Sequence, residues 1–267
     1  MKKLSVPLFV KLLSLVLSLL LLGGCVSSYS RPPEYTDANT DDLPVIAETA
    51  PPVTKKRVAI TFDDGPQNYD ERTKKIVDEL DLYGFHATFF VVGNRVTNGD
   101  AITYAVEHGN EIGIHGYTHS SDAYYDSCSD DRYEEEISKT ARAIYKYLPD
   151  YQIKTMRPVG GKISQERIRE SAYAVILWSI DSDDWGNRYY SGIPDEEAQE
   201  VVDTIVANVM DSVSDGDIIL LHDIYESTYD ATRIILKRLY EEGYEVVSVS
   251  QLLGEDMQPG RAYSRKE

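Results

Sequence analysis

The sequence places two pairs of potential metal ligands or acid–base groups just after short apolar runs. Asp63 and Asp64 follow the first run, and His115 and His119 follow the third. Gly116 disfavours a regular helix between the histidines, so we expect both of them on a loop. Two imidazoles and a carboxylate suit a divalent ion such as zinc and leave a coordination position for water. The same ligands also describe a non-haem iron site, so these residues predict a divalent metal without deciding which one.

Three later apolar runs are also followed by charged or titratable residues. They are Arg157 after the fourth run, Asp181 and Asp184 after the fifth, and His222 and Asp223 after the sixth. A single residue of this kind is usually a helix cap or a turn former. In parallel βα folds, however, the carboxyl ends of the strands meet at one mouth. Five such groups, each after a different apolar run, therefore predict one functional site.

The apolar runs alternate with segments of helical period, and this alternation predicts the fold. The expected strands are 58–62, 88–92, 111–115, 153–156, 174–180, 217–221 and 245–249. The expected helices are one that starts in a capping box of Asn68 with Glu71, one that ends near Gly109, and 133–148, 165–173, 196–213 and 231–242. About seven alternations in roughly 200 residues indicate a single α/β domain with a parallel sheet, either a barrel or doubly wound.

Composition excludes several classes of protein. The 267 residues are 42% hydrophobic and 27% charged, which is typical of a globular chain and not of a disordered one. A formal net charge of -18 argues against a nucleic-acid partner, because binding a phosphate backbone needs a basic face. Two cysteines are too few for a disulfide framework.

The first 55 residues have the composition of an export signal and a tether. Residues 1–25 combine lysines with an apolar run of 11 residues that is too short to span a bilayer as a helix. The run ends in Leu22-Gly23-Gly24-Cys25, which resembles a bacterial lipobox. We therefore expect a lipid on Cys25, a polar, proline-rich tether over residues 26–55, and a position on the outer side of the cell membrane. An ordinary signal peptide or an uncleaved anchor are the alternatives.

Five short motifs in order along residues 56–254 resemble those of the polysaccharide deacetylases, carbohydrate esterase family 4, and in particular bacterial peptidoglycan N-acetylglucosamine deacetylases. The motifs are Thr61-Phe62-Asp63-Asp64-Gly65-Pro66, His115-Gly116-Tyr117-Thr118-His119, Arg157-Pro158, Asp181-Ser182-Asp183-Asp184-Trp185 and Leu220-Leu221-His222. The resemblance implies one catalytic domain, a distorted parallel (β/α) barrel of about seven strands. Residues 255–267 are then expected to be a C-terminal tail.

The chain departs from the family pattern in two motifs. Position 116 is Gly, where the family usually has a Ser or Thr whose hydroxyl helps to hold the histidine loop. The third motif has Gly160 in place of the usual Tyr, so the ring that would line the groove is absent. The backbone N–H of Gly160 is still expected to help hold the oxyanion. The second change therefore concerns the shape of the substrate groove more than the chemistry.

The resemblance implies a role for each motif residue. Asp64, His115 and His119 would bind one divalent ion, with zinc favoured and cobalt, manganese or iron also suited to these ligands. Asp63 would be the general base, oriented by Arg157, and His222 the general acid. The carboxylate beside His222 would be Asp184, with Asp181 as the alternative. Gly160, Trp185 and Leu220 would contact the substrate or the oxyanion.

The expected reaction is hydrolysis of N-acetyl groups on a cell-wall or related polysaccharide, most of all on the amino sugars of peptidoglycan. An O-acetyl esterase acting on a xylan-like polymer and a chitin-oligomer deacetylase would use the same groups. A glycan-binding lipoprotein without catalysis is the alternative of another class, but binding alone does not need Asp63, Arg157 and His222. The expected partners are a polysaccharide and, through the lipid at Cys25, the membrane, and the sequence does not predict whether the chain has protein partners.

Overall fold

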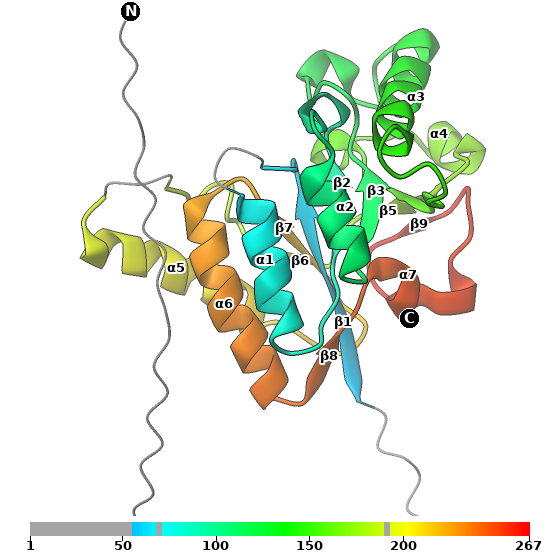
Figure 1. Cartoon of the computed structure of the whole chain (residues 1–267). Coiled ribbons are helices and arrows are strands. Elements are labelled where there is room, and N and C mark those ends of the chain that lie inside the picture. The colour runs from blue at the N-terminus through cyan, green and yellow to red at the C-terminus, as the bar shows by residue number, and fades with distance from the viewer. Residues whose placement is uncertain (1–54, 68–70, 190–192) are drawn as a thin grey trace, which may run out of the picture. The chain divides into compact units, whose positions relative to one another are not determined.

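The computed structural model describes residues 55–67, 71–189 and 193–267. Its centre is a curled sheet in which the strands run parallel (Figure 1). The strands are β1 (Lys56–Asp63), β2 (Thr88–Val91), β3 (Glu111–Ile114), β4 (Thr155–Met156), β5 (Ala174–Ile176), β6 (Ile180–Asp181), β7 (Ile218–His222), β8 (Tyr244–Val246) and β9 (Ala262–Tyr263). The order is β6-β7-β1-β2-β3-β4-β5-β9, and β8 pairs with the start of β1. The predicted distorted parallel barrel is confirmed.

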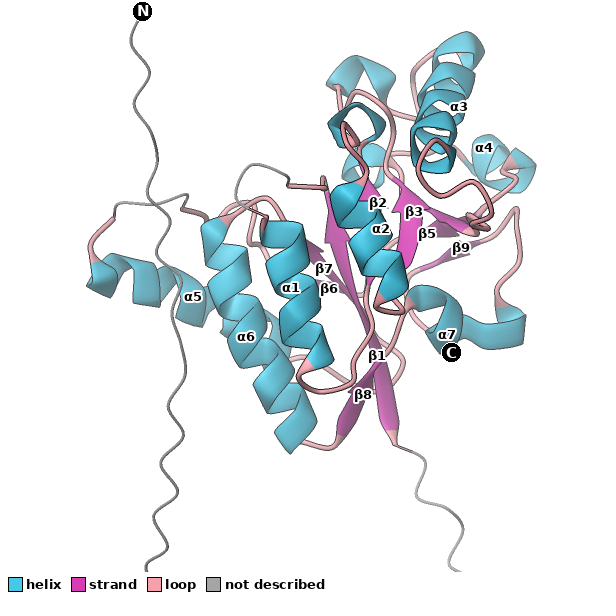
Figure 2. Ribbon diagram, viewed as in Figure 1, coloured by secondary structure: helices cyan, strands magenta, loops and turns pink. Residues whose placement is uncertain are grey.

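Helices cover the outer face of this sheet (Figure 2). They are α1 (Arg72–Asp81), α2 (Asp100–Glu107), α3 (Asp130–Tyr145), α4 (Gln165–Glu170), α5 (Asp195–Met210), α6 (Glu226–Glu241) and α7 (Val249–Leu253). Short 3-10 turns occupy Gly93–Arg95, Ser121–Ala123, Val159–Gly161 and Gly254–Asp256. Within the described ranges, no helix combines the length and the apolar character that a membrane span requires.

Strand β1 shows how the alternation of side chains divides the interior into two parts. Val58, Ile60 and Phe62 are fully buried in the large apolar cluster under the helices. The side chains between them face the inside of the curled sheet, where Thr61 is fully buried and Asp63 is almost so. Thr61 and Asp63 therefore lie inside the barrel, with Asp63 at the carboxyl end of the strand.

The expected strand 174–180 is wrong, because the structure divides it into β5 and β6. β5 pairs with β4 and β9, whereas β6 pairs with β7, so the two pieces belong to different parts of the sheet. Carbonyl groups left at this break are hydrogen-bonded by Arg157, whose Nε and Nη2 lie 3.1 Å and 2.9 Å from the oxygens of Ile176 and Leu177. A side chain thus completes the barrel where the backbone ladder stops.

Other element ends also differ from the sequence analysis. Helix α1 begins after Glu71, which has a left-handed backbone and makes no side-chain cap, while Asn68 lies outside the described residues. Val249 starts α7 instead of ending a strand, because Ser248 and Gln251 form a capping box there. The C-terminal segment contributes β9, which the sequence analysis did not expect. The predicted signal 1–25 and nearly all of the tether 26–55 lie outside the described residues.

Candidate active site

The carboxyl ends of neighbouring strands bring the predicted site residues together. Asp63 ends β1 and His222 ends β7, and the two are partners in the β1–β7 register. His115 follows β3 directly, with its backbone N–H donating to Val91 of β2 at 2.9 Å. Parallel strands share one edge, so residues that are 159 positions apart lie side by side here.

Asp64, His115 and His119 form a compact cluster whose ligand atoms lie within 4.8 Å of one another. Asp64 Oδ1 is 2.8 Å from His119 Nε2 and 3.5 Å from His115 Nε2. Asp64 and His119 both have positive φ, 75° and 53°, in the left-handed region that most side chains avoid. Such conformations are kept only where the surroundings hold them in place.

The protonation pattern of this cluster fits a bound cation. The ring Nδ1 of His115 lies 2.9 Å from the carbonyl oxygen of Arg157 and donates to it, so in the neutral ring Nε2 carries the lone pair that a metal would bind. No hydrogen bond with good geometry reaches the buried Oδ1 of Asp64. A carboxylate oxygen and an imidazole lone pair facing each other repel unless a cation lies between them. Burial alone would raise the pKa of Asp64. In the metal-free state with both imidazoles protonated, the positive charges of His115 and His119 outweigh burial and lower that pKa, so the carboxylate is held as the anion that a metal needs.

Asp63 lies beside this cluster in a fixed orientation. Its Oδ1 accepts a hydrogen bond from Arg157 Nη1 at 2.9 Å, and its Oδ2 lies 3.6 Å from His115 Nε2. Arg157 is fully buried and is itself held by Thr61 Oγ1 at 2.7 Å and by the ring of Phe90, 4.5 Å away. Because Arg157 occupies Oδ1, only Oδ2 of Asp63 is free to interact with the cluster of Asp64, His115 and His119.

His222 has a buried carboxylate on its far side. Asp184 is fully buried, and its Oδ1 lies 2.8 Å from His222 Nδ1. Its Oδ2 accepts from the backbone N–H of His222 at 2.7 Å and from Thr228 Oγ1 at 2.6 Å. Burial alone would lower the pKa of His222, but the hydrogen bond and charge of Asp184 raise it to about 9. Asp181, the alternative partner, is exposed and accepts from the backbone of Asp183 instead.

Asp223, the residue after His222, supports the turn that carries Asp64. It is buried, and the Thr73 hydroxyl donates to it. A Cβ at position 65 would lie 2.4 Å from its carboxylate oxygens, which explains why a glycine stands in this turn. Burial raises the pKa of Asp223 to about 7.

The three residues expected to contact substrate are placed differently from one another. Gly160 is exposed in the turn Val159–Gly161, which begins two residues after Arg157. Trp185 is 50% exposed, next to Asp184 in the chain. Leu220 is buried in β7, on the same face of the strand as His222 by the period of two. Their contacts with substrate remain predictions.

Sequence reasoning did not single out Glu136 or Thr228, which hold site residues from two different helices. Thr228 donates to Asp184, and Glu136 accepts hydrogen bonds from the histidine loop. Glu136 is one of three consecutive glutamates in α3 and the one that is 1% exposed. The helical phase set by Ile137 and Ala141 was the available signal, but it does not predict which loop a buried carboxylate meets.

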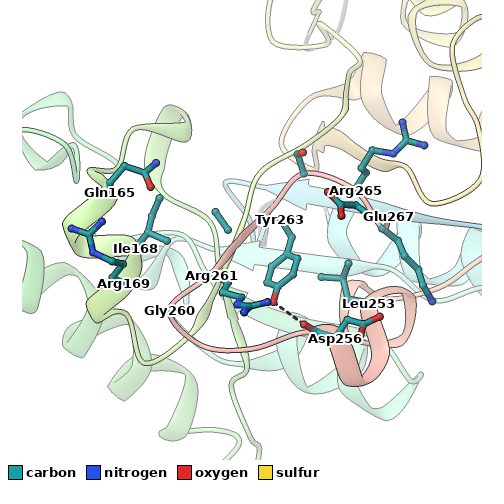
Figure 3. A pocket seen from close by; sticks show the side chains of 13 residues that line it. Gln165, Ile168, Arg169, Leu253, Asp256, Gly260, Arg261, Tyr263, Arg265 and Glu267 are labelled. Carbon is teal, nitrogen blue, oxygen red and sulfur yellow. Dashed lines mark hydrogen bonds between the residues drawn. The ribbon is translucent and has the colours of Figure 1, made fainter.

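A separate cavity of about 780 Å³ lies between α4 and the C-terminal segment (Figure 3). Residues that line it include Arg169, Arg261, Tyr263 and Arg265. None of the predicted site residues lines this cavity. Size alone therefore does not locate the chemistry, and the titratable cluster at the strand ends is the candidate active site.

Comparisons with known proteins agree with this site. The family model described as polysaccharide deacetylase matches residues 50–175. A peptidoglycan-N-acetylglucosamine deacetylase of Bacillus cereus is 34% identical over 178 residues, which is 64% of this chain and 75% of that protein. The chain belongs to the polysaccharide deacetylase family. The predicted assignment to hydrolases of this family is thereby confirmed.

Other members of the family are similar over more of this chain. The Listeria monocytogenes peptidoglycan-N-acetylglucosamine deacetylase PgdA is 32% identical over 80% of this chain and 42% of its own length. The Bacillus subtilis peptidoglycan-N-acetylmuramic acid deacetylase PdaC is 36% identical over 77% of this chain and 40% of its own length. The chain therefore spans about two fifths of each of these two relatives.

Solved structures of the family share the fold. Peptidoglycan deacetylase PdaC of Bacillus subtilis has a TM-score of 0.65 at 35% identity, covering 74% of this chain and 90% of that one. A family 4 acetyl xylan esterase from Clostridium thermocellum, in complex with a cobalt ion, has a TM-score of 0.66 at 31% identity. That match covers 79% of this chain and 98% of the esterase. Relatives named for different polysaccharides thus share this architecture.

Proposed function

We propose that this chain is a metal-dependent deacetylase that removes N-acetyl groups from cell-wall polysaccharide, with the amino sugars of peptidoglycan as its substrate. The observation that carries the proposal is the pairing of Asp63 with His222 at adjacent strand ends, next to the cluster of Asp64, His115 and His119. A base and an acid beside a metal site are the groups that hydrolysis of an amide requires.

Asp64, His115 and His119 are the residues that would hold the ion. When bound there, a divalent metal lowers the pKa of a water molecule and polarises an acyl oxygen. The histidine Nε2 atoms and Asp64 Oδ1 face one another, as ligands must. Zinc is our proposal for the ion, because three protein ligands of this kind are typical of catalytic zinc.

Asp63 would take the proton from the attacking water. Arg157 occupies its Oδ1, so Oδ2 is the atom that accepts the proton. The charge-assisted hydrogen bond from Arg157 holds Asp63 in the orientation that a general base needs. The fixed geometry also limits the reorganisation required in each turnover.

His222 would protonate the leaving nitrogen. Its Nδ1–H donates to Asp184 Oδ1, so the transferable proton is the one on Nε2. With a pKa of about 9, the imidazole is charged at neutral pH and ready to act as an acid. An amine is a poor leaving group unless it is protonated as the bond breaks, so this proton matters more for an amide than for an ester.

The proposed location follows from the sequence. A lipid on Cys25 and the tether over 26–55 would hold the domain on the outer side of the membrane, close to the wall polymer. The relatives named for peptidoglycan support this substrate, since they include enzymes named for N-acetylglucosamine and for N-acetylmuramic acid.

Acetate release is the experiment that tests the proposal. Purified peptidoglycan, chitin oligomers and acetylated xylan are compared as substrates, with the metal-free protein and after addition of zinc, cobalt, manganese or iron(II). We expect release from peptidoglycan that needs added metal and is absent in Asp64→Ala. Full activity after exhaustive chelation would refute metal dependence, and preferential release from xylan would refute the substrate.

A further inference from the structure

The loop that carries the two histidines has no side chain of its own at position 116 to hold it. Gly116 has φ 73°, and a Cβ there would lie 3.1 Å from Glu136 Oε2, 3.1 Å from Tyr125 Oη and 3.2 Å from Val159 Cγ2. A serine or threonine would therefore be strained and crowded at this position. The loop must be held from outside.

Glu136 of α3 supplies that hold. Its Oε2 accepts from the backbone N–H groups of Tyr117 at 2.5 Å and Thr118 at 2.9 Å. Its Oε1 accepts from the Thr118 hydroxyl at 2.8 Å and lies 3.2 Å from Arg132 Nη2. Both oxygens are thus used, and the carboxylate is 1% exposed, so these contacts are strong and poorly replaced by water.

His119 depends on this loop more than His115 does. The ring of His115 is buried and its Nδ1 is fixed by the carbonyl of Arg157. The ring of His119 is 32% exposed, and within the described part of the chain no group hydrogen-bonds its Nδ1. Its φ of 53° is a left-handed conformation that persists only where neighbours impose it. Glu136 hydrogen-bonds the backbone of the two residues just before His119.

We propose that Glu136 is a positioning residue of the metal site. It fixes the backbone of Tyr117 and Thr118, so that His119 reaches Asp64 with its Nε2 aimed at the ion. The inference rests on the proposed function, because it concerns the ion which that function requires. It adds a residue from α3 to a site otherwise built at the ends of β1 and β3.

The test measures metal affinity and does not use turnover. Dissociation constants for zinc are measured by competition with a chelating dye in wild type, Glu136→Gln and Glu136→Ala, well below the melting temperature of each metal-free protein. Glu135→Gln is the matched control, since Glu135 is the neighbouring residue of α3 and also pairs with Arg132, but on the surface. The absorption spectrum of the cobalt-loaded protein reports ligand geometry independently.

We expect Glu136→Ala to weaken zinc binding about 10- to 100-fold, the usual effect of removing a partner that orients a ligand. Glu136→Gln should fall between that variant and wild type, because its amide oxygen still accepts from the backbone while its NH₂ opposes Arg132. Glu135→Gln should change the constant less than twofold. The cobalt spectrum should change in the Glu136 variants alone.

Two results overturn this inference alone. If both Glu136 variants bind zinc within twofold of wild type and only melt at lower temperature, Glu136 stabilises the fold and does not position the site. If Glu135→Gln weakens binding as much as Glu136→Gln, the effect is one of helix charge. A wild-type protein that binds no divalent ion would instead overturn the proposed function together with this inference.

Discussion

Replacing Asp184 by asparagine should move the alkaline limit of activity by more than two pH units. Asp184 raises the pKa of His222 from an ordinary 6.5 to about 9, against the effect of burial. Without the carboxylate of Asp184, burial would be opposed only by the charges of Asp63 and Asp64, so we expect the pKa of His222 to return to near 6.5. A shift of that size is worth about 3 kcal/mol of preference for the protonated imidazole.

The loss of rate follows from the fraction of His222 that carries a proton. At pH 8 this fraction falls from about nine-tenths with a pKa of 9 to about 3% with a pKa of 6.5, so kcat should fall ~30-fold. Below pH 6 both enzymes hold the proton, and the difference should shrink to a fewfold. The sign is fixed, because a group with a raised pKa keeps its proton at low pH and loses it only on the alkaline side.

The assay is acetate release from an N-acetylated oligosaccharide between pH 5 and 10, at saturating substrate and constant metal. Asp181→Asn is the matched control, since Asp181 lies in the same motif but is exposed and does not contact His222. An alkaline limit that does not move in Asp184→Asn would refute the reasoning. An equal shift in Asp181→Asn would show that the charge of the loop matters and the hydrogen bond does not.

Further predictions concern other parts of the molecule. Asp63→Asn should bind metal normally but lose about 10²–10⁴-fold in turnover of both N-acetyl sugar and aryl acetate. His222→Ala should lose activity on the N-acetyl sugar but keep it on the aryl ester, whose leaving group needs no proton. Equal loss on both substrates would contradict the role of His222 as the general acid. Cys25→Ser should release the protein from membranes or leave an unprocessed precursor, and unchanged lipid labelling would exclude a lipid at this residue. Glu111→Ala should lower the free energy of unfolding by about 3 kcal/mol in urea titrations, because four hydrogen bonds from three elements converge on that buried carboxylate.

The motif residues could be placed from the sequence because their positions relative to the strands decide where they meet. Asp63 and His222 each end an apolar run, and parallel pairing makes them neighbours. The break between β5 and β6 could not be predicted in this way. The same apolar sequence can form one strand or two short strands joined by a bend. The residue that hydrogen-bonds the carbonyl groups at the bend, Arg157, follows a different strand.

Glu136 shows a second limit of the sequence. A glutamate in a charged helix is usually solvated, and the helical phase of Ile137 and Ala141 does not indicate which loop a buried Glu136 would meet. Its partners, Tyr117 and Thr118, lie 19 and 18 residues earlier. Only the packing of α3 against the histidine loop brings them together, and that packing depends on Gly116 having no side chain.

The guanidinium of Arg157 joins the carbonyl groups at the break in the sheet to the proposed catalytic base. One side chain therefore serves barrel closure and the proposed chemistry at once, so that replacing Arg157 would affect both. A descendant of this chain that gave up catalysis but had to stay folded would be expected to change Asp63 or His222 and to retain Arg157. In an alignment of the family, an arginine at this position would thus indicate a closed barrel and not an active enzyme.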